Sequence, residues 1–204
     1  MEEYIDISKA DMLQIKLGMK SFANLEESQG TSQIQSSRYL RDCMIGDEIG
    51  VSKMNHAIHG WDGKFDNGIP FENKNVSSKA KSWSTLALQF KDTSTTKLDE
   101  LCKGVIATQS IWENSGSTAY IMIGNTKYIG EALRKSYNPE SRNTCMVGMR
   151  KCLNSGFKLV AMDYTKQQVI DHITNKFPGL GKSLNSDNIF TREDLPALVA
   201  SIME

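Results

Sequence analysis

Two carboxylate residues and a lysine lie close together in the middle of the chain, with a spacing that suits metal-assisted chemistry. The segment from Asp62 to Lys74 reads Asp-Gly-Lys-Phe-Asp-Asn-Gly-Ile-Pro-Phe-Glu-Asn-Lys, so Glu72 and Lys74 are two positions apart. In a strand, residues two apart project from the same face. Mg²⁺ prefers carboxylate oxygens and water, and a nearby ammonium can orient an attacking water or stabilise charge on a phosphate. Asp62, Glu72 and Lys74 therefore form a candidate Mg²⁺ site.

The Glu-x-Lys pattern alone carries little weight, because a chain of this composition contains about one such tripeptide by chance. Its context adds weight. Asn67-Gly68 is a strong signal for a tight turn between two short strands, at residues 61–65 and 69–76. A stretch rich in Lys, Ser and Thr follows. The alternative is an exposed hairpin whose charges form salt bridges of little energetic value.

The geometry of this hairpin decides whether Asp62 can join Glu72. With a strict two-residue turn at Asn67-Gly68, Gly63 would face Glu72, and Asp62 would lie on the opposite face of the ribbon. A connection with an odd number of residues brings Asp62 onto the face of Glu72. So does a bulge at Pro70, which cannot donate a ladder hydrogen bond. The candidate site therefore predicts an irregular or odd-numbered hairpin.

The spacing of these residues resembles that of a known enzyme family. Asp62, nine intervening residues and then Glu72-x-Lys74, with Asp66-Asn67 in between, closely resemble the signature of the PD-(D/E)xK nucleases. Within that superfamily the segment looks most like the restriction endonucleases of the PvuII type. Trp61 stands where the proline that gives the signature its name would be. This substitution does not exclude membership.

The resemblance is local, covering roughly residues 60–76, and it implies a mechanism and a fold. It implies that Asp62, Glu72 and the backbone carbonyl of Asn73 bind Mg²⁺, for which Mn²⁺ can substitute, and that Lys74 positions the nucleophilic water. Asp62, Glu72 and Lys74 would be the catalytic residues of a Type II restriction endonuclease. Such an enzyme hydrolyses phosphodiester bonds of double-stranded DNA at a short specific site. The implied fold is a restriction-endonuclease-like central mixed β-sheet flanked by helices.

Enzymes of this family usually read bases with the elements that follow the catalytic strand. Short polar side chains suit base edges and lysines suit phosphates. In this chain the candidates are Asn75, Ser77, Ser78, Lys79, Lys81, Ser84 and Thr85. An ordinary solvated loop is the alternative. Palindromic sites call for two-fold symmetric proteins, so the resemblance also implies a homodimer, joined through the N-terminal helices.

Other interpretations of the same residues stay open. A PD-(D/E)xK nuclease of repair, recombination or replication would share the chemistry and recognise DNA structure instead of sequence. A non-catalytic DNA-binding protein with the same fold would keep its function after Glu72→Ala. Glu48, in the helix expected before the hairpin, is a candidate accessory residue. His56 and His59 have a spacing that could bind a metal on a helix, but they lack a third ligand nearby and are interpreted as a helix end.

Hydrophobic periodicity and turn signals predict the elements that position these residues. Helices are predicted at residues 8–25 (capped by Ser8), 37–58, 96–112 (capped by Thr96), 144–153, 165–177 and 191–202. Strands are predicted at residues 61–65, 69–76, 82–90, 117–123 and 157–162. Helices, a hairpin and then strands alternating with helices indicate a mixed sheet flanked by helices, in the α/β or α+β class.

The overall composition is that of one globular domain. With 204 residues, 39% hydrophobic and 24% charged, the chain supports a single domain, 1–204, and argues against disorder. Residues 1–58 would form N-terminal helices with a dimerisation role, 60–164 the catalytic core, and 165–204 C-terminal helices. The formal net charge is zero, so affinity for DNA must come from the distribution of charge. The cysteine pattern and the absence of a long apolar run predict a reducing, cytoplasmic location and no membrane span.

Overall fold

An eight-stranded β-sheet runs through the computed structural model, which describes residues 4–6, 8–28, 38–55, 60–80 and 87–204. Its strands are β1 (Tyr4–Asp6), β2 (Lys53–Asn55), β3 (Gly63–Lys64), β4 (Pro70–Ser77), β6 (Ile106–Asn114), β7 (Ser117–Asn125), β9 (Lys158–Ala161) and β10 (Ile189–Thr191). The order across the sheet is β1-β2-β3-β4-β6-β7-β9-β10. β4 pairs with β6 and β9 with β10 in parallel, whereas the other neighbours are antiparallel, so the sheet is mixed.

Helices flank this sheet, and a separate antiparallel pair of strands lies beside it. The pair is β5 (Ala87–Phe90) and β8 (Cys145–Gly148). The helices are α1 (Lys9–Ser28), α2 (Arg38–Ile49), α3 (Thr95–Lys103), α4 (Gly130–Ser136), α5 (Met149–Asn154), α6 (Lys166–Lys176), α7 (Pro178–Gly181) and α8 (Leu195–Met203). The predicted α/β class, a mixed sheet flanked by helices, is confirmed.

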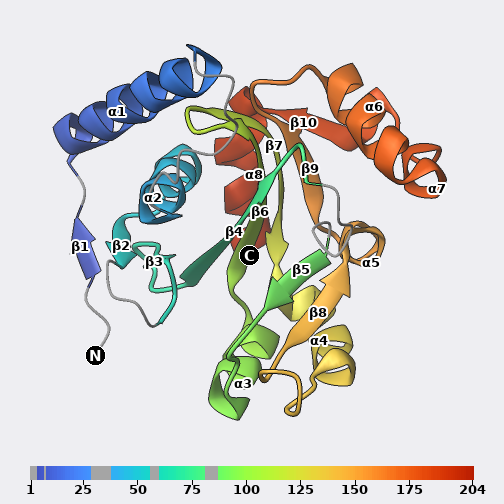
Figure 1. The fold of residues 1–204 in the computed structure, drawn as a ribbon. Coiled ribbons are helices and arrows are strands. Elements are labelled where there is room, and N and C mark those ends of the chain that lie inside the picture. Colours follow the sequence, from blue (N-terminus) through green and yellow to red (C-terminus); the bar gives the residue numbers. More distant parts are fainter. Residues whose placement is uncertain (1–3, 7, 29–37, 56–59, 81–86) are drawn as a thin grey trace.

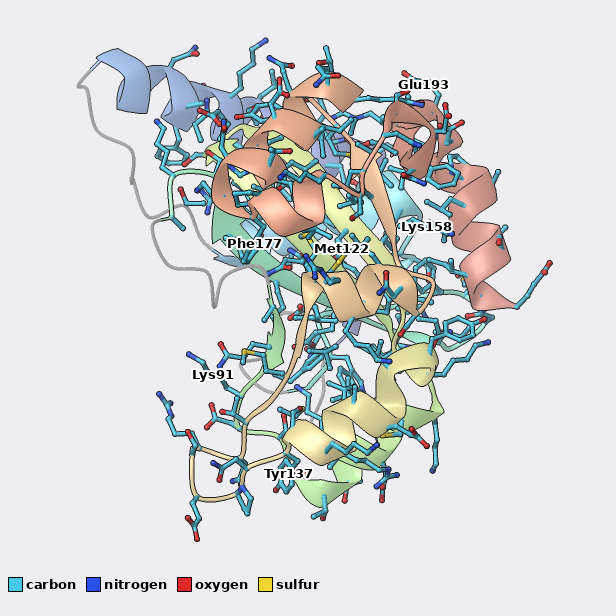
Figure 2. All side chains as sticks on the ribbon, turned by 90° about the vertical axis from the view of Figure 1, so that its right-hand side faces the viewer. Lys91, Met122, Tyr137, Lys158, Phe177 and Glu193 are labelled. Atoms are coloured by element: carbon cyan, nitrogen blue, oxygen red, sulfur yellow. The ribbon has the colours of Figure 1, made fainter. Side chains whose placement is uncertain are left out.

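Two hydrophobic clusters cover the two faces of the sheet, because successive residues of a strand point to opposite sides. In β7, Ile121 packs toward α2 and α8 in a cluster that includes Leu198, and Figure 1 shows α8 behind the sheet. The adjacent Tyr120 belongs to the cluster on the other face, with side chains of α3, α4, α5 and α6. Figure 2 shows the molecule from the side, with α6 and α7 above and with α3 and α4 below, near Tyr137.

All three regions predicted from the sequence contribute to the same sheet. β1 and β2 come from residues 1–58, and β10 comes from residues 165–204. α2 packs against β4, so the N-terminal region lies next to the strand that carries the candidate site.

The predicted helix at residues 96–112 is wrong in its second half. α3 ends at Lys103, and Gly104 follows with a φ of +134°, a backbone conformation that favours glycine and ends the helix. The residues after it form β6, a central strand whose first seven residues are all buried. The cap also differs: Ser94, not Thr96, precedes the helix, and its side chain accepts a backbone N–H of the first turn.

The predicted helix at residues 144–153 is wrong in its first half. Cys145–Gly148 is the strand β8, and only the short helix α5 follows. β8 pairs with β5, where Leu88 lies opposite Val147. This partner lies in the predicted strand at residues 82–90, of which the structure describes 87–90. Local periodicity cannot show a partner so far away in the chain.

The predicted helix at residues 37–58 is wrong in its last part. α2 ends at Ile49, before Gly50 with a φ of +78°, and Lys53–Asn55 is the strand β2, which pairs with β1 and β3.

The other predicted elements are confirmed, with shifted ends. Ser8 accepts the backbone N–H of Asp11 and so caps α1. Thr165 caps α6 in a reciprocal capping box with Gln168. Residues 117–123 lie in β7, 157–162 contain β9, and 191–202 contain a 3₁₀ turn and α8. The predicted helix end at His56 and His59 lies outside the described residues.

None of the helices in the described part of the chain is both long enough and apolar enough to span a membrane. The four cysteines are free thiols: Cys43, Cys102, Cys145 and Cys152.

Candidate active site

The hairpin of β3 and β4 has the odd-numbered connection that the candidate site requires. Gly63 pairs with Phe71, and the three residues 66–68 connect the paired strands. Extending this register by one residue sets Asp62 opposite Glu72, and opposite residues of neighbouring strands share a face. The predicted geometry is therefore confirmed by the turn alone, without a bulge.

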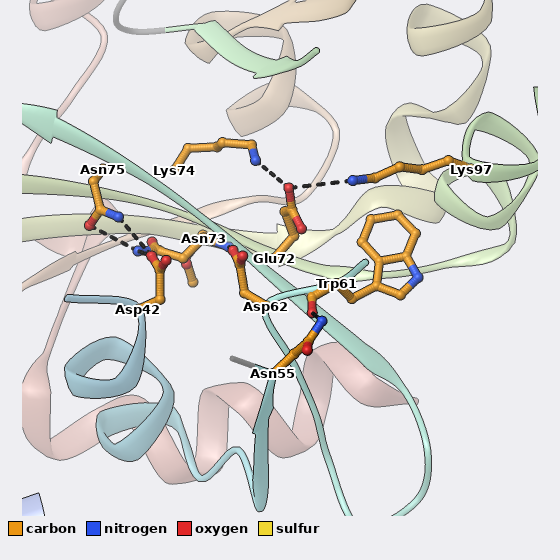
Figure 3. Close-up of polar contacts among 10 residues, drawn as sticks. Asp42, Asn55, Trp61, Asp62, Glu72, Asn73, Lys74, Asn75 and Lys97 are labelled. Atoms are coloured by element: carbon orange, nitrogen blue, oxygen red, sulfur yellow. Dashed lines mark hydrogen bonds and ion pairs between the residues drawn. The ribbon is translucent and has the colours of Figure 1, made fainter. Parts of the chain in front are cut away.

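Asp62 lies against the backbone of β4 (Figure 3). Its Oδ2 atom accepts the backbone N–H of Asn73 at 2.7 Å. The N–H and C=O of one strand residue point to the same edge of the strand, so the carbonyl oxygen of Asn73 faces the same side as Asp62. The carboxylate of Asp62 and the carbonyl of Asn73, two of the three predicted metal ligands, thus lie at one edge of β4.

The surroundings of Asp62 carry an excess of negative charge. Its pKa is raised from 3.8 to about 8, and the causes in order of size are burial and the charges of Glu72 and Asp42. The Lys74 ammonium and the Asn73 N–H lower the pKa of Asp62 in part. At Asp62, burial and the two neighbouring carboxylates therefore outweigh the Lys74 ammonium and the Asn73 N–H.

Glu72 is nearly buried, with 4% of its surface exposed, and its two oxygens have different surroundings. Oε1 forms ion pairs with Nζ of Lys74 and, at 3.8 Å, with Nζ of Lys97. Figure 3 shows both ammonium groups pointing toward this carboxylate. Oε2 is buried and has no hydrogen-bond partner among the described residues. We call Asp62, Glu72, Lys74 and Lys97 the Asp62 cluster.

Trp61 supports one of these lysines. Nζ of Lys97 lies 4.6 Å from the centre of the Trp61 ring, a cation–π contact. The indole N–H of Trp61 donates to Oε2 of Glu100 at 3.0 Å. Lys97 and Glu100 are one turn apart on α3, so Trp61 fixes this helix to the site.

A polar network lies on the other face of β4, between the strand and α2. Oδ1 of Asp42 accepts hydrogen bonds from the side-chain amides of Asn73, at 2.8 Å, and Asn75, at 2.7 Å. Oδ1 of Asn73 in turn accepts the hydroxyls of Thr108 and Ser110, at 2.8 and 3.0 Å. Asp42 is 5% exposed, so this network holds a buried carboxylate next to Asp62.

The donors at this edge of β4 fit a hard cation. Among the residues that the structure describes, no group of three or more His, Cys, Asp or Glu side chains is arranged to hold a metal ion. The candidate donors are of a different kind, because they comprise only two carboxylate side chains, Asp62 and Glu72, and one main-chain oxygen, the carbonyl of Asn73. The unpartnered Oε2 of Glu72 and the raised pKa of Asp62 both indicate unbalanced negative charge. Oxygen donors with unbalanced charge are what Mg²⁺ binds.

Glu48, the predicted accessory residue, makes its described contacts elsewhere. Its carboxylate lies 4.0 Å from Nζ of Lys16 and 3.6 Å from Nε of Arg192. Glu48 is six residues after Asp42 on α2, so the two side chains point about 120° apart around the helix. The carboxylate that α2 brings to the site is Asp42.

The predicted base-reading residues divide into three groups. Asn75 and Ser78 do not fit the role, because Asn75 hydrogen bonds with Asp42 and Ser110, and Ser78 is 5% exposed. Ser77 is half-buried and Lys79 is exposed. The remaining three lie outside the described residues: Lys81, Ser84 and Thr85.

Ser78 belongs to a second polar cluster, beyond the end of β4. We call it the Ser78 network: Ser78, Glu113, Tyr120, Tyr164, His172 and Lys176. Oε2 of Glu113 accepts the hydroxyls of Tyr164, at 2.6 Å, and Ser78, at 2.8 Å. Nε2 of His172 donates to the Ser78 carbonyl at 3.0 Å, which leaves Nδ1 to accept the Tyr120 hydroxyl at 3.0 Å.

Asp42 and Lys97 could not be identified from the sequence as residues of the site. Asn73 and Asn75 alternate with Glu72 and Lys74, so a strand at this position has polar residues on both faces. A polar partner on the second face could have been expected from this pattern, but nothing in the sequence identifies it as Asp42. Lys97 lies in a correctly predicted helical turn that no local signal connects to the hairpin.

Comparison of the whole sequence with models of protein families and with curated proteins finds no match. A functional conclusion must therefore rest on the residues of the site and on their geometry.

Proposed function

We propose that this chain is a Mg²⁺-dependent endonuclease that hydrolyses phosphodiester bonds in double-stranded DNA at a short specific site, as Type II restriction enzymes do. The observation that carries the proposal is the hairpin register. The three-residue connection sets Asp62 opposite Glu72, and Lys74 pairs with Glu72 on the same face. A merely salt-bridged hairpin does not account for the buried, unpartnered Oε2 of Glu72.

The residues have distinct roles in this proposal. Asp62, Glu72 and the carbonyl of Asn73 hold the cation, Mg²⁺ or its substitute Mn²⁺. The cation supplies positive charge that polarises a phosphate and makes water easier to deprotonate. Lys74 orients the attacking water toward phosphorus and stabilises the charge that develops on the phosphate oxygens. Asp42 keeps β4 in place from its other face, through its hydrogen bonds to Asn73.

The proposed partners are double-stranded DNA and a second copy of the chain, in the cytoplasm. Ser77 and Lys79 are the described candidates for contact with DNA after the catalytic strand. Leu13 and Leu17 are 56% and 51% exposed and lie one turn apart on α1. This apolar pair supports dimerisation through the N-terminal helices, the symmetry that a palindromic site requires.

The proposal is tested by incubating the protein with long double-stranded DNA, in Mg²⁺ or in EDTA. We expect discrete fragments in Mg²⁺ and none in EDTA. Lys74→Ala and Glu72→Ala should abolish the fragments, whereas Lys53→Ala, an exposed lysine of β2, should leave them unchanged. Cleavage without discrete bands would favour the repair or recombination alternative. Absence of cleavage by the folded wild-type protein on any DNA, with DNA binding intact in Glu72→Ala, would favour the non-catalytic alternative and defeat the proposal.

A further inference from the structure

Glu72 has one more cation than its proposed role with Lys74 requires. Lys97, from α3, directs its ammonium at the same oxygen, Oε1, while Oε2 has no partner among the described residues. The second lysine adds positive charge beside Oε1 but leaves the hydrogen bonding of Oε2 unmet. The second lysine is therefore unexplained by the packing of Glu72.

The position of Lys97 is fixed by its surroundings. It lies in the first turn of α3, and its own backbone N–H donates to the capping side chain of Ser94. Its ammonium rests on the ring of Trp61, which is itself held by Glu100. The side chain keeps 24% of its surface exposed, so a ligand can reach it. A preorganised and accessible ammonium loses little entropy when it binds an anion.

The two lysines lose their shared anion when Glu72 serves as a metal ligand. A carboxylate that donates its electron pairs to a cation offers less charge to its other neighbours, so the Lys97 ammonium becomes available for another anion. In the proposed nuclease, which this inference presupposes, the anion that enters the site is a phosphodiester. Lysine binds phosphate oxygens as a compact point charge.

We propose that Lys97 is a phosphate-binding residue of the Asp62 cluster, whose ammonium exchanges Glu72 for a DNA phosphate when Glu72 binds a metal ion. Lys97 thereby couples the two ligands: occupancy of the metal site raises the affinity for DNA, and DNA raises the affinity for metal by the same factor. Before DNA binds, Lys97 competes with the metal for Glu72. The substitution Lys97→Gln should therefore have opposite effects on the two ligands.

Two binding measurements test this coupling without relying on cleavage. Filter binding of a labelled linear plasmid is compared in Ca²⁺, as a hard cation, and in EDTA. We expect Ca²⁺ to raise the affinity of the wild-type protein for DNA, and we expect Lys97→Gln to lose about tenfold or more of that gain.

Mn²⁺ binding to the protein alone is followed by electron paramagnetic resonance, where Lys97→Gln should bind Mn²⁺ about two- to fivefold more tightly than wild type. Lys97→Arg, which keeps the charge, should retain most of the gain in DNA affinity. Lys103→Gln, an exposed lysine at the other end of α3, is the matched control and should behave as wild type.

The outcomes separate this inference from the proposed function. An equal Ca²⁺-dependent gain in Lys97→Gln and wild type overturns the role of Lys97. So does the absence of any gain in wild type. Weaker Mn²⁺ binding in Lys97→Gln also overturns it, since Lys97 would then hold the Glu72 carboxylate in position for the metal instead of competing with the metal. A wild-type protein that shows the coupling but never cuts DNA in Mg²⁺ defeats the proposed nuclease and leaves the phosphate site standing.

Discussion

Two polar clusters lie along β4, and they differ in how their buried charged groups are paired. In the Ser78 network, Glu113 accepts two hydroxyls, and both ring nitrogens of His172 are hydrogen bonded. In the Asp62 cluster, Oε2 of Glu72 has no described partner, and Asp62 lies among like charges. Buried polar groups in proteins are normally paired, so the single unpartnered oxygen of Glu72 distinguishes the Asp62 cluster from the Ser78 network.

The pKa values follow the same division. Burial alone would raise the pKa of Glu113, but hydrogen bonds from Tyr164 and Ser78 outweigh it, and the pKa is lowered. Burial lowers the pKa of His172 below its usual value. At Asp62, burial and the charges of Glu72 and Asp42 outweigh the Lys74 ammonium and the Asn73 N–H, and the pKa is raised. The charged groups of the Ser78 network are paired within the protein, whereas in the Asp62 cluster Oε2 of Glu72 has no partner among the described residues, as the proposed metal site requires.

Asp62→Asn is expected to have the largest effect on DNA cleavage. The amide cannot serve as an anionic metal ligand, so DNA cleavage in Mg²⁺ should fall by about 10³-fold or more. The same change removes a charge that burial and two carboxylates oppose. The metal-free protein should therefore become more stable near pH 8, by about 1 kcal/mol or more, in urea unfolding. A variant that loses both activity and stability would place Asp62 with the structural residues.

Tyr164→Phe tests the other cluster. It removes a hydroxyl that donates to Glu113 and should lower the free energy of unfolding by about 1–2 kcal/mol. Cleavage per folded molecule should stay within about threefold of wild type, because Tyr164 touches no residue of the Asp62 cluster in the described contacts. A loss of cleavage comparable to that of Asp62→Asn would erase the distinction between the two clusters.

The stability of the metal-free protein should depend on pH in opposite directions through the two clusters. Folded Asp62 retains a proton that the unfolded chain releases between pH 3.8 and about 8, so its contribution to stability falls as pH rises through this window. His172 takes up a proton in the unfolded chain below about pH 6.5, whereas its lowered pKa in the folded protein opposes protonation. The contribution of His172 to stability therefore falls as pH drops.

Urea unfolding in EDTA across this pH range measures both slopes. We expect Asp62→Asn to reduce the fall in the free energy of unfolding toward high pH. We expect His172→Gln to reduce its fall toward low pH. Identical pH profiles for wild type and Asp62→Asn would contradict the unbalanced charge assigned to Asp62.

The smallest effect is expected at Glu48, which lies in neither cluster. Its ion pairs with Lys16 and Arg192 are partly exposed, so Glu48→Gln should change the free energy of unfolding by less than about 1 kcal/mol. Cleavage in Mg²⁺ should be unchanged within error. A large loss of cleavage would restore Glu48 as an accessory residue of the site.

The central geometry of the candidate site could be predicted from the sequence because it is local. Asp62, Glu72 and Lys74 are joined by one short hairpin, where strand alternation and the length of the turn decide which side chains share a face. Asp42 and Lys97 reach the site from α2 and α3, through packing that no spacing in the sequence encodes. The predicted role of Ser78 failed for a similar reason, since Glu113 lies 35 residues away in the chain.

The errors in the fold have a related cause. Residues 106–112 form a buried central strand, yet Thr108, Gln109 and Ser110 interrupt its apolar pattern. These polar side chains form hydrogen bonds to residues far away in the chain: Thr108 and Ser110 donate to Asn73 of β4, and Gln109 donates to the Ala87 carbonyl of β5. A strand whose polar residues are paired at long range can have the same local hydrophobic periodicity as a helix. In the sequence, only Gly104 marks the boundary between α3 and β6.

The three-residue turn has a consequence for the register of the hairpin. Residues 66–68 are exposed, so insertions and deletions there cost little stability. Because side chains alternate along a strand, a change in this turn that slips the pairing of β3 and β4 by one residue turns Asp62 away from Glu72, and a slip of two returns both to one face. A slip of one residue would thus leave a folded hairpin in which the two carboxylates of the proposed site no longer share a face.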